Sequence, residues 1–232
     1  MVAFALLHSP SVGPSTWHPV AEELRRRGHA VAVPDVRAVA SSPPPYAERV
    51  VQLATAQCAA LNGDALLVAV GHSNAGLFLP ALAHAIGARM LVFVDASVPP
   101  DTGSAEMVPA RFAAELRRKA VDGVLPRWTD WWSEADVAAL FADAETRRRV
   151  VDEQPQLPLA YYEERVAVPE DWASTAAAYL LFGPPYTEVA YAAGARGWPV
   201  AHVPGEHLHM VVDPHAVTDA LLDLTAQLSE AR

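Results

Sequence analysis

Hydrophobic residues occur along the chain in short uninterrupted runs, and segments with a helical pattern lie between these runs. Such runs are typical of parallel strands that are covered on both faces, because no side of the strand faces water. The alternation predicts an α/β fold with about six strands in a mostly parallel sheet and helices on both of its faces. The expected strands are residues 2–7, 30–35, 65–71, 90–95, 176–182 and 199–204. The expected helices are residues 15–28, 46–62, 74–87, 186–196 and 214–230.

Residues 97–172 break this alternation. No run in this segment predicts a strand, and prolines separate its helical stretches. We therefore expect a helical cap inserted after the fourth strand. The remaining residues, 1–96 and 173–232, then form the α/β core. The expected cap helices are residues 109–120, 134–151 and 158–166.

The cap segment also carries a group of aromatic residues. We expect most of them to pack the cap against the core, because each large aromatic side chain buries much apolar area. Trp128 and Trp132 are candidates for a second role, as walls of a pocket between the cap and the sheet.

Composition and charge narrow the class of protein. With 232 residues, of which 52% are hydrophobic, the chain suits one domain with a large core. Its formal net charge of −10 disfavours nucleic acid and anionic membranes as partners. Cys58 is the only cysteine, so the chain forms no internal disulfide. The apolar run 2–7 is too short for a leader or a membrane span, and we expect a location in the cytoplasm.

No cofactor motif is visible in the sequence. The histidines and carboxylates lack a metal-ligand spacing such as H-E-x-x-H, and there is no glycine-rich phosphate loop. We therefore expect neither a metal nor a nucleotide cofactor, and the expected partner is a small apolar carbonyl substrate.

The sequence GHSNAG at residues 71–76 points to a catalytic serine. A nucleophile elbow places a serine on a sharp turn between a strand and a helix, where the backbone runs close to its neighbours. Small residues are needed two positions before and after that serine. Gly71 and Ala75 meet this requirement around Ser73. The backbone N–H of Asn74 then lies at the start of a helix, where it can donate to an oxyanion.

A serine hydroxyl needs a base within hydrogen-bond reach. Most of the nine histidines fall in predicted helices or strands, but VPGEHLHMVVDP at residues 203–214 is a loop after the last strand. Loops at the carboxyl ends of parallel strands meet at one edge of the sheet, where the elbow also lies. His207 is our candidate for the base, and His209 is the alternative.

Together these features resemble the α/β-hydrolase superfamily, and within it the compact esterase and hydroxynitrile-lyase-like branch. The matching stretches are LLHSPSVGPSTWHPVAEEL, GHSNAG, VFVDASVPP and VPGEHLHMVVDP, which cover almost the whole chain in order. The resemblance implies the α/β-hydrolase fold without the first two strands of the family, and a triad of serine, histidine and an acid.

The acid departs from the family's usual place. The superfamily commonly carries it in the loop after the penultimate strand, where this chain has Gly183, Pro184 and Pro185. A known alternative in this fold is an acid at the end of the preceding strand, and Asp95 stands there. A carboxylate that ends a buried strand is costly unless it is paired, and an imidazole N–H is a suitable partner. Asp95 is our candidate, and Glu188 is the alternative.

The loop after the first strand also departs from the family pattern. Relatives typically show His-Gly-x, in which the N–H of x donates to the oxyanion, whereas this chain has His8, Ser9 and Pro10. Proline carries no N–H, so the Ser9 hydroxyl or the Ser11 amide would have to serve instead. Hydroxynitrile-lyase-like relatives also place a hydroxyl residue after the histidine, where it binds substrate oxygen. His8 and His72 are possible pocket residues, although a loop-organising role is the simpler interpretation of His8.

Three functions are compatible with these residues. The leading hypothesis is a serine hydrolase that acts on a small or medium apolar ester, thioester or lactone, with Ser73 as nucleophile, His207 as base and Asp95 orienting the base. The alternative is a lyase, dehydratase or cyclase in which Ser73 and His207 act as an acid–base pair, and Ser9 and Pro10 support it. The third is a ligand-binding protein without turnover, which has no need of all three side chains.

Overall fold

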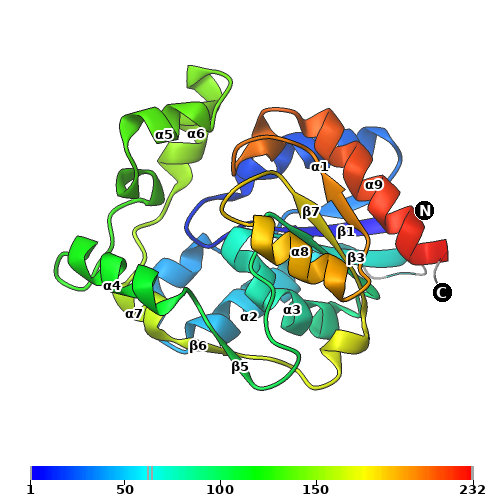
Figure 1. The fold of residues 1–232 in the computed structure, drawn as a ribbon, viewed down its shortest axis with the longest axis horizontal. Coiled ribbons are helices and arrows are strands. Elements are labelled where there is room, and N and C mark those ends of the chain that lie inside the picture. The colour runs from blue at the N-terminus through cyan, green and yellow to red at the C-terminus, as the bar shows by residue number, and fades with distance from the viewer. Residues whose placement is uncertain (1, 62, 64, 231–232) are drawn as a thin grey trace.

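The six apolar runs form a single parallel sheet. The structure is a computed structural model that describes residues 2–61, 63 and 65–230. The strand order is β2-β1-β3-β4-β7-β8, and every neighbouring pair is parallel (Figure 1). This confirms the predicted six-stranded sheet. The strands are β1 (Val2–Leu7), β2 (Ala30–Ala32), β3 (Leu66–His72), β4 (Met90–Val94), β7 (Ala176–Leu181) and β8 (Val200–His202).

The two edge strands are shorter than their apolar runs. β2 and β8 have three residues each, although runs 30–35 and 199–204 were expected to be extended throughout. β2 pairs only with residues 3–5 of β1, and β8 pairs only with residues 179–181 of β7. Residues of both edge strands are partly exposed, whereas β4 is buried along its length.

Helices cover both faces of the sheet. One face packs against α1 and α9, through a cluster that includes Phe4, Leu6 and Val92. Alternate residues of the same strands, such as Ala69 and Phe93, point to the other face, which α2, α3 and α8 cover. Because side chains alternate between faces along a strand, two covered faces require continuous apolar runs. These helices are α1 (His18–Arg26), α2 (Tyr46–Cys58), α3 (Leu79–Ile86), α8 (Thr187–Ala195) and α9 (Pro214–Glu230).

Helices α2 and α3 differ from their predicted bounds. α2 ends at Cys58 and a 3₁₀ turn follows it, while the predicted end at residue 62 lies outside the described residues. A 3₁₀ helix at Ser73–Phe78 precedes α3, which therefore begins later than expected. Gly87 ends α3 with a φ of 69°, a left-handed conformation that glycine adopts without strain.

Helices α4 to α7 lie together at one side of the sheet, on the left in Figure 1. The single helix expected over 134–151 is in fact two helices, because Asp143 starts a new one by accepting a hydrogen bond from the Thr146 N–H at 2.8 Å. We keep the names cap, for residues 97–172, and core, for the rest, as a proposed division of the chain. The cap helices are α4 (Ala110–Lys119), α5 (Glu134–Ala139), α6 (Ala144–Glu153) and α7 (Leu159–Glu163).

The cap also contains two strands where none was expected. β5 (Ser104–Glu106) and β6 (Arg165–Ala167) pair antiparallel, and β6 replaces the end of the helix expected over 158–166. Each strand has three residues with one buried position, which is too short for an alternating pattern to be recognised in the sequence.

The longest of the described helices, α9, has 17 residues. Within the part of the chain that the structure describes, no helix combines the length and the apolar character that crossing a membrane requires.

Candidate active site

Ser73 stands at a sharp turn between β3 and the 3₁₀ helix that follows it. Its φ of 60° lies in the left-handed region, which costs a residue with a side chain about 1–2 kcal/mol. The neighbouring chain holds this turn in place, because the Ser97 N–H donates to the Ser73 carbonyl at 3.1 Å. This is the geometry expected of a nucleophile elbow.

Space around the turn explains the small residues of the motif. A Cβ atom on Gly71 would lie 2.8 Å from Leu79 Cγ, and one on Gly76 would lie 2.1 Å from the carbonyl oxygen of Ser97. Gly76 is therefore the tighter position, although the sequence pattern drew attention to Gly71 and Ala75. The methyl group of Ala75 is fully buried and fits.

Three side chains from distant parts of the chain meet at this turn. His207, in the loop after β8, has its Nε2 3.0 Å from Ser73 Oγ. Its Nδ1 lies 2.6 Å from Asp95 Oδ2, and Asp95 directly follows β4. When Nδ1–H donates to the carboxylate, Nε2 is left to accept the serine proton. The structure thus brings together the serine, histidine and aspartate that the sequence predicted.

Asp95 is fully buried, and backbone amides satisfy its other oxygen. Asp95 Oδ1 accepts from the Phe182 N–H at 3.0 Å and from the Gly183 N–H at 3.4 Å. These amides belong to the loop after β7, the usual place of the acid in the family. The loop therefore supplies donors that stabilise the Asp95 carboxylate instead of a carboxylate of its own.

The two alternative residues lie elsewhere. Glu188 is exposed in the first turn of α8. The ring of His209 packs edge-on against Phe182, with centroids 5.7 Å apart, and it fills the space beside Gly205, where a Cβ would lie 2.2 Å from His209 Nδ1. Neither side chain takes part in the hydrogen bonds described for Ser73.

His72 lies beneath His207 and does not face an open pocket. Its side chain is buried, and its Nε2–H donates to the His207 carbonyl at 2.8 Å. The two rings are 4.4 Å apart between centroids. Burial, and then the nearby His207, lower the pKa of His72 well below its usual value, so the ring stays neutral. Its position suits holding the His207 backbone in place, and its possible pocket role stays a prediction.

His8 organises the loop after β1 and is likewise buried, and its possible pocket role stays a prediction. Its Nδ1–H donates to the Ser9 carbonyl at 2.8 Å, and its Nε2 accepts from the Val36 N–H at 3.2 Å. Burial lowers the pKa of His8 to about 4, so the neutral ring can keep both roles at once.

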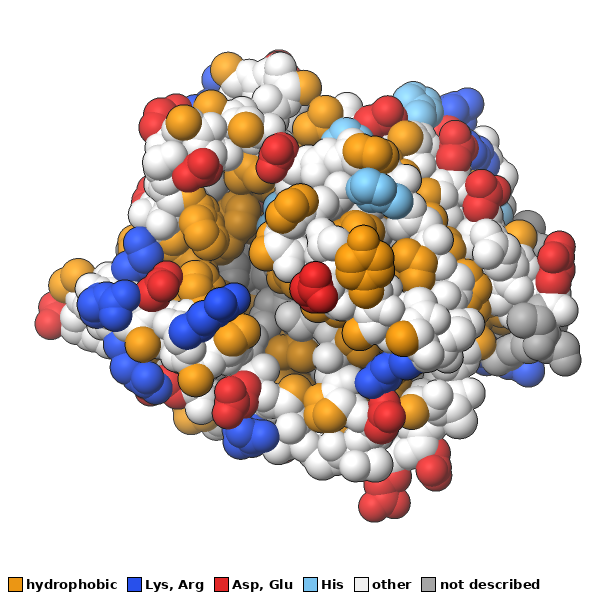
Figure 2. All heavy atoms as spheres, in the orientation of Figure 1, with side chains coloured by type: hydrophobic (Ala, Val, Ile, Leu, Met, Phe, Trp, Pro, Cys, Tyr) orange, Lys and Arg blue, Asp and Glu red, His pale blue; other side chains and the backbone are white. Residues whose placement is uncertain are grey.

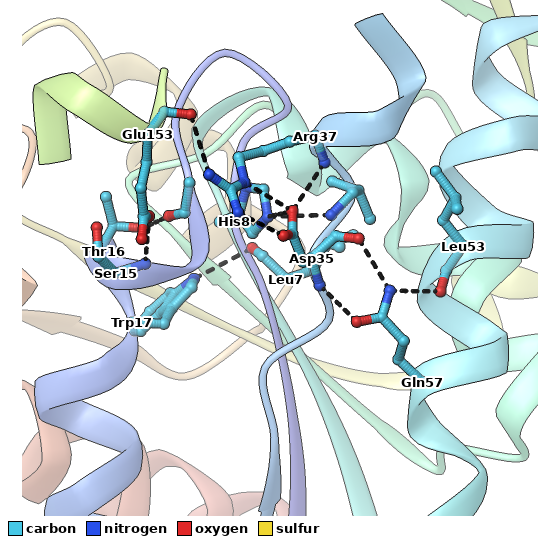
Figure 3. A network of polar contacts seen from close by, with 12 residues as sticks. Leu7, His8, Ser15, Thr16, Trp17, Asp35, Arg37, Leu53, Gln57 and Glu153 are labelled. Atoms are coloured by element: carbon cyan, nitrogen blue, oxygen red, sulfur yellow. Dashed lines mark hydrogen bonds and ion pairs between the residues drawn. The ribbon is translucent and has the colours of Figure 1, made fainter. Parts of the chain in front are cut away.

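Figure 3 shows how the same loop is tied to the cap. Glu153, the last residue of α6, accepts from the Ser15 N–H at 3.0 Å. Its carbonyl accepts from Arg37 at 3.5 Å, and Arg37 also forms an ion pair with Asp35 at 2.7 Å. Next to them, the Trp17 indole N–H donates back to the end of β1. These contacts fix the loop between the core and the cap.

The residues that follow His8 leave few free donors. Ser9, Pro10 and Ser11 are all buried. The Ser11 N–H points to Ser9 Oγ at 3.4 Å, and the Ser11 hydroxyl bonds to the hydroxyl of Tyr162 in the cap. Pro10 has no N–H. Of the donors that the sequence suggested for an oxyanion at this loop, the Ser11 N–H is therefore directed elsewhere, and the Ser9 hydroxyl is left.

Asn74 connects the elbow to the cap through its side chain. Its Nδ2–H donates to the Met107 carbonyl at 2.8 Å, and its Oδ1 accepts from the hydroxyl of Tyr161 in α7. Both bonds are buried. They fix the peptide whose N–H was predicted to face the oxyanion.

Tyr186 is a site residue that sequence reasoning missed. Its ring stacks on the His207 ring, with centroids 5.3 Å apart and planes within 14°. Its hydroxyl lies 3.4 Å from Ser73 Oγ. The only signal in the sequence was its place, directly after the Gly183–Pro185 turn where the family would carry its acid.

The cap contributes an aromatic wall near the site. Trp128 lies 6.0 Å from the His207 ring between centroids, and Trp132 lies 6.2 Å from Trp128. Figure 2 shows the surface hollowed between the cap and the core, with hydrophobic side chains along the wall on the cap side. Trp132 is 44% exposed and also lines a separate cavity of about 360 Å³ within the cap. Of the two tryptophans, Trp128 is the one with a ring contact to His207.

The described residues include no group of three or more His, Cys, Asp or Glu side chains that could hold a metal ion.

A comparison with protein families gives one match. The model of the family described as alpha/beta hydrolase family matches residues 4–220. No curated protein matches the sequence.

Several solved structures share the fold. An extracellular alpha/beta-hydrolase from a Paenibacillus species is 18% identical with a TM-score of 0.74, over 97% of this chain and 99% of that chain. Polyneuridine aldehyde esterase is 17% identical with a TM-score of 0.72, over 97% and 99%. Tomato methylketone synthase I, solved with 2-tridecanone, is 14% identical with a TM-score of 0.72, over 98% of both chains. Identities this low show a common fold and nothing more specific.

Proposed function

This chain belongs to the alpha/beta hydrolase family, and from that premise we propose that it is a serine hydrolase acting on a small or medium apolar ester, thioester or lactone. Its parallel sheet with helices on both faces is the α/β-hydrolase fold. The observation that carries the proposal is the position of His207, 3.0 Å from Ser73 Oγ and 2.6 Å from Asp95. A nucleophile, a base and a group that orients the base are the requirements of acyl transfer through a serine.

In the first half of the reaction, Ser73 Oγ attacks the carbonyl carbon while its proton passes to His207 Nε2. The electron pair of the C=O bond moves to the carbonyl oxygen, and Asp95 stabilises the imidazolium that forms. The N–H of Asn74 is the donor we propose for this oxyanion. The intermediate then collapses, the bond to the leaving oxygen or sulfur breaks, and His207 returns its proton to that atom.

In the second half, water resolves the acyl-enzyme. His207 Nε2 takes a proton from the water as its oxygen attacks the acyl carbon, and the same proton then passes to Ser73 Oγ as the C–O bond to the serine breaks. The products are an acid and a free enzyme with its original protons. None of these proposed steps requires a cofactor.

The cap supports an apolar substrate. Trp128 stands beside His207, and the hollow between cap and core in Figure 2 has hydrophobic side chains on its cap wall. Mostly apolar walls with a few polar groups are typical of small-molecule sites. Polyneuridine aldehyde esterase, a structure with the same fold, is named as an esterase.

A fluorophosphonate probe and p-nitrophenyl butyrate test the proposal together. We expect the wild type to be labelled and to hydrolyse the ester, and Ser73→Ala to lose both activities. Ser41→Ala, which changes an exposed serine, serves as the matched control and should behave as the wild type. Labelling that persists in Ser73→Ala would show that the nucleophile is a different residue.

A second candidate function keeps Ser73 and His207 but forms no acyl-enzyme. In this function the two side chains exchange protons with the substrate in a lyase, dehydratase or cyclase step. Pro10 favours this function, because a residue without an N–H cannot donate a hydrogen bond that stabilises the oxyanion of a tetrahedral intermediate. Tomato methylketone synthase I, a structure with the same fold, was solved with a ketone. Turnover without burst kinetics and without an acylated serine would favour this candidate.

We also propose that the protein acts in the cytoplasm, where its lone cysteine would stay reduced. The similar Paenibacillus structure is described as extracellular, so cell fractionation is the direct test.

A further inference from the structure

We propose that Tyr186 is a catalytic residue whose O–H donates to Ser73 Oγ each time that oxygen carries negative charge, first in attack and again on release from the acyl-enzyme. The inference rests on the proposed hydrolase function. Its first support is contact, since the Tyr186 hydroxyl lies 3.4 Å from Ser73 Oγ. Catalytic hydrogen bonds are often long before substrate binds and shorten during the reaction.

The structure holds Tyr186 in this place from two sides. Its ring stacks on His207 with centroids 5.3 Å apart and planes within 14°, so the base and the tyrosine ring hold each other in orientation. Its backbone joins the turn to the next helix, because the Tyr186 N–H donates to the Gly183 carbonyl at 3.2 Å and the Tyr186 carbonyl accepts from the Ala190 N–H at 3.0 Å. A donor that is fixed before the reaction costs little reorganisation when charge develops.

The loop after β1 offers the site few backbone donors. Pro10 cannot supply an amide, and the Ser11 N–H is directed to Ser9 Oγ. The Tyr186 hydroxyl adds a donor from a different loop, the one after β7. It does not replace the oxyanion donor at Asn74 but lowers the energy of the other oxygen that gains charge, Ser73 Oγ.

The phenol also stays in the right protonation state. Burial raises the pKa of Tyr186 and outweighs the hydrogen bonds with the Ser73 and Ser97 side chains, which lower it, so the O–H remains intact at neutral pH. The group gives no proton away in the cycle. The serine proton still travels to His207 and back, and the tyrosine contributes a hydrogen bond only.

Tyr186→Phe is the test, because it keeps the ring on His207 and removes only the oxygen. With p-nitrophenyl butyrate we expect kcat to fall by about 10- to 100-fold, less than the roughly 100- to 1,000-fold loss typical of an oxyanion-hole donor, with KM changed by less than about threefold. Labelling of Ser73 by a fluorophosphonate should slow by a similar factor. Tyr191→Phe is the matched control, since Tyr191 lies in α8, which begins directly after Tyr186, and is 70% exposed, and it should leave all rates unchanged.

A second variant separates the hydroxyl from the ring. Tyr186→Leu removes both, and we expect at least the loss seen with Tyr186→Phe. Tyr186→Phe with wild-type kcat and labelling, alongside an impaired Tyr186→Leu, would show that the ring only packs His207 and would overturn the proposal. A wild type that neither hydrolyses the ester nor labels would instead overturn the hydrolase function, and this role with it.

Discussion

The core and the cap are built in different ways. Core strands such as β4 are buried along their whole length, and side chains on both faces pack against helices. The cap helices bury much less, and α4, α5 and α6 each have a single buried residue, Leu116, Val137 and Val150. The core can therefore hold Ser73 and Asp95, whose φ angles of 60° and 43° lie in the left-handed region, in fixed positions. The cap needs outside support to keep its shape.

Part of that support is apolar, because cap residues such as Val150 and Leu116 pack into hydrophobic clusters with core residues. The rest comes from polar contacts with the core. Tyr161 and Tyr162 bond to Asn74 and Ser11, next to the reacting groups. Farther away, Glu164 accepts from two N–H groups at the start of α2, both at 2.8 Å. These contacts reach the elbow and the loop after β1. We therefore infer that the core carries the catalytic side chains and that the cap forms the walls of the substrate pocket.

The largest expected effect comes from Asp95, the buried carboxylate that we propose orients His207. Asp95→Asn should lower kcat by about 10,000-fold, because the amide no longer fixes the imidazole tautomer. Glu188→Gln, which changes the alternative acid on the surface of α8, is the control and should retain full activity. Ester hydrolysis by the two variants checks this, and a greater loss in Glu188→Gln would mean that Asp95 is not the acid.

The next effect concerns packing. Phe93 is fully buried in β4 and stacks on Trp198 at 5.5 Å, so Phe93→Ala should lower the free energy of unfolding by about 3–5 kcal/mol. Trp132→Ala in the cap should cost less than about 1 kcal/mol, because that side chain is 44% exposed. Denaturant unfolding measures both. Equal losses would contradict the difference between core and cap.

A pH-dependent effect follows from the buried His8. The unfolded chain binds a proton on this residue near pH 6.5, but burial lowers the pKa in the folded protein to about 4. The unfolded state therefore holds more protons in this window, so stability is complete above about pH 6.5 and falls as the pH is lowered, by about 3 kcal/mol at pH 4. His72 acts in the same direction.

His8→Gln tests this contribution, because glutamine does not titrate. Unfolding free energies measured from pH 7 to pH 4 should decline less steeply in the variant than in the wild type. Parallel curves for the two proteins would show that His8 does not carry the effect.

The smallest effect concerns the cap's attachment. Glu164→Ala should destabilise the protein by about 1 kcal/mol, since it removes a charged acceptor from the first turn of α2. Glu163→Ala is the neighbouring control. It breaks only an exposed ion pair with Arg117, which is expected to contribute less than about 0.5 kcal/mol. Thermal unfolding distinguishes the two, and equal shifts would argue against a specific role of Glu164 in joining cap to core.

Sequence predicted the core well because its constraints are local. Parallel strands buried on both faces need continuous apolar runs, and an elbow needs glycine where a Cβ would strike the chain, as at Gly71 and Gly76. Asp95 was predicted as the acid because Gly183, Pro184 and Pro185 occupy the place where the family usually carries one. The amides of Phe182 and Gly183 that stabilise it come from a distant strand end and left no mark in the sequence.

The cap and part of the site were harder to predict for the same reason. Three-residue strands show no periodicity. The break before α6 depends on Asp143, whose side chain accepts a hydrogen bond from the Thr146 N–H at the start of that helix. Tyr186 looks like any aromatic residue in a loop until folding places it on His207, and the bonds from Asn74 to the cap join residues far apart in the chain.

The central claim is that Ser73 becomes acylated, and trapping that species tests it most directly. The wild type is mixed with excess p-nitrophenyl butyrate, quenched in acid within the first turnovers, digested and examined by peptide mass spectrometry. We predict a butyryl group on the peptide that contains Ser73, formed in step with the burst of p-nitrophenol. Continued release of p-nitrophenol with no acyl group on that peptide, and with Ser73→Ala equally active, would contradict the account.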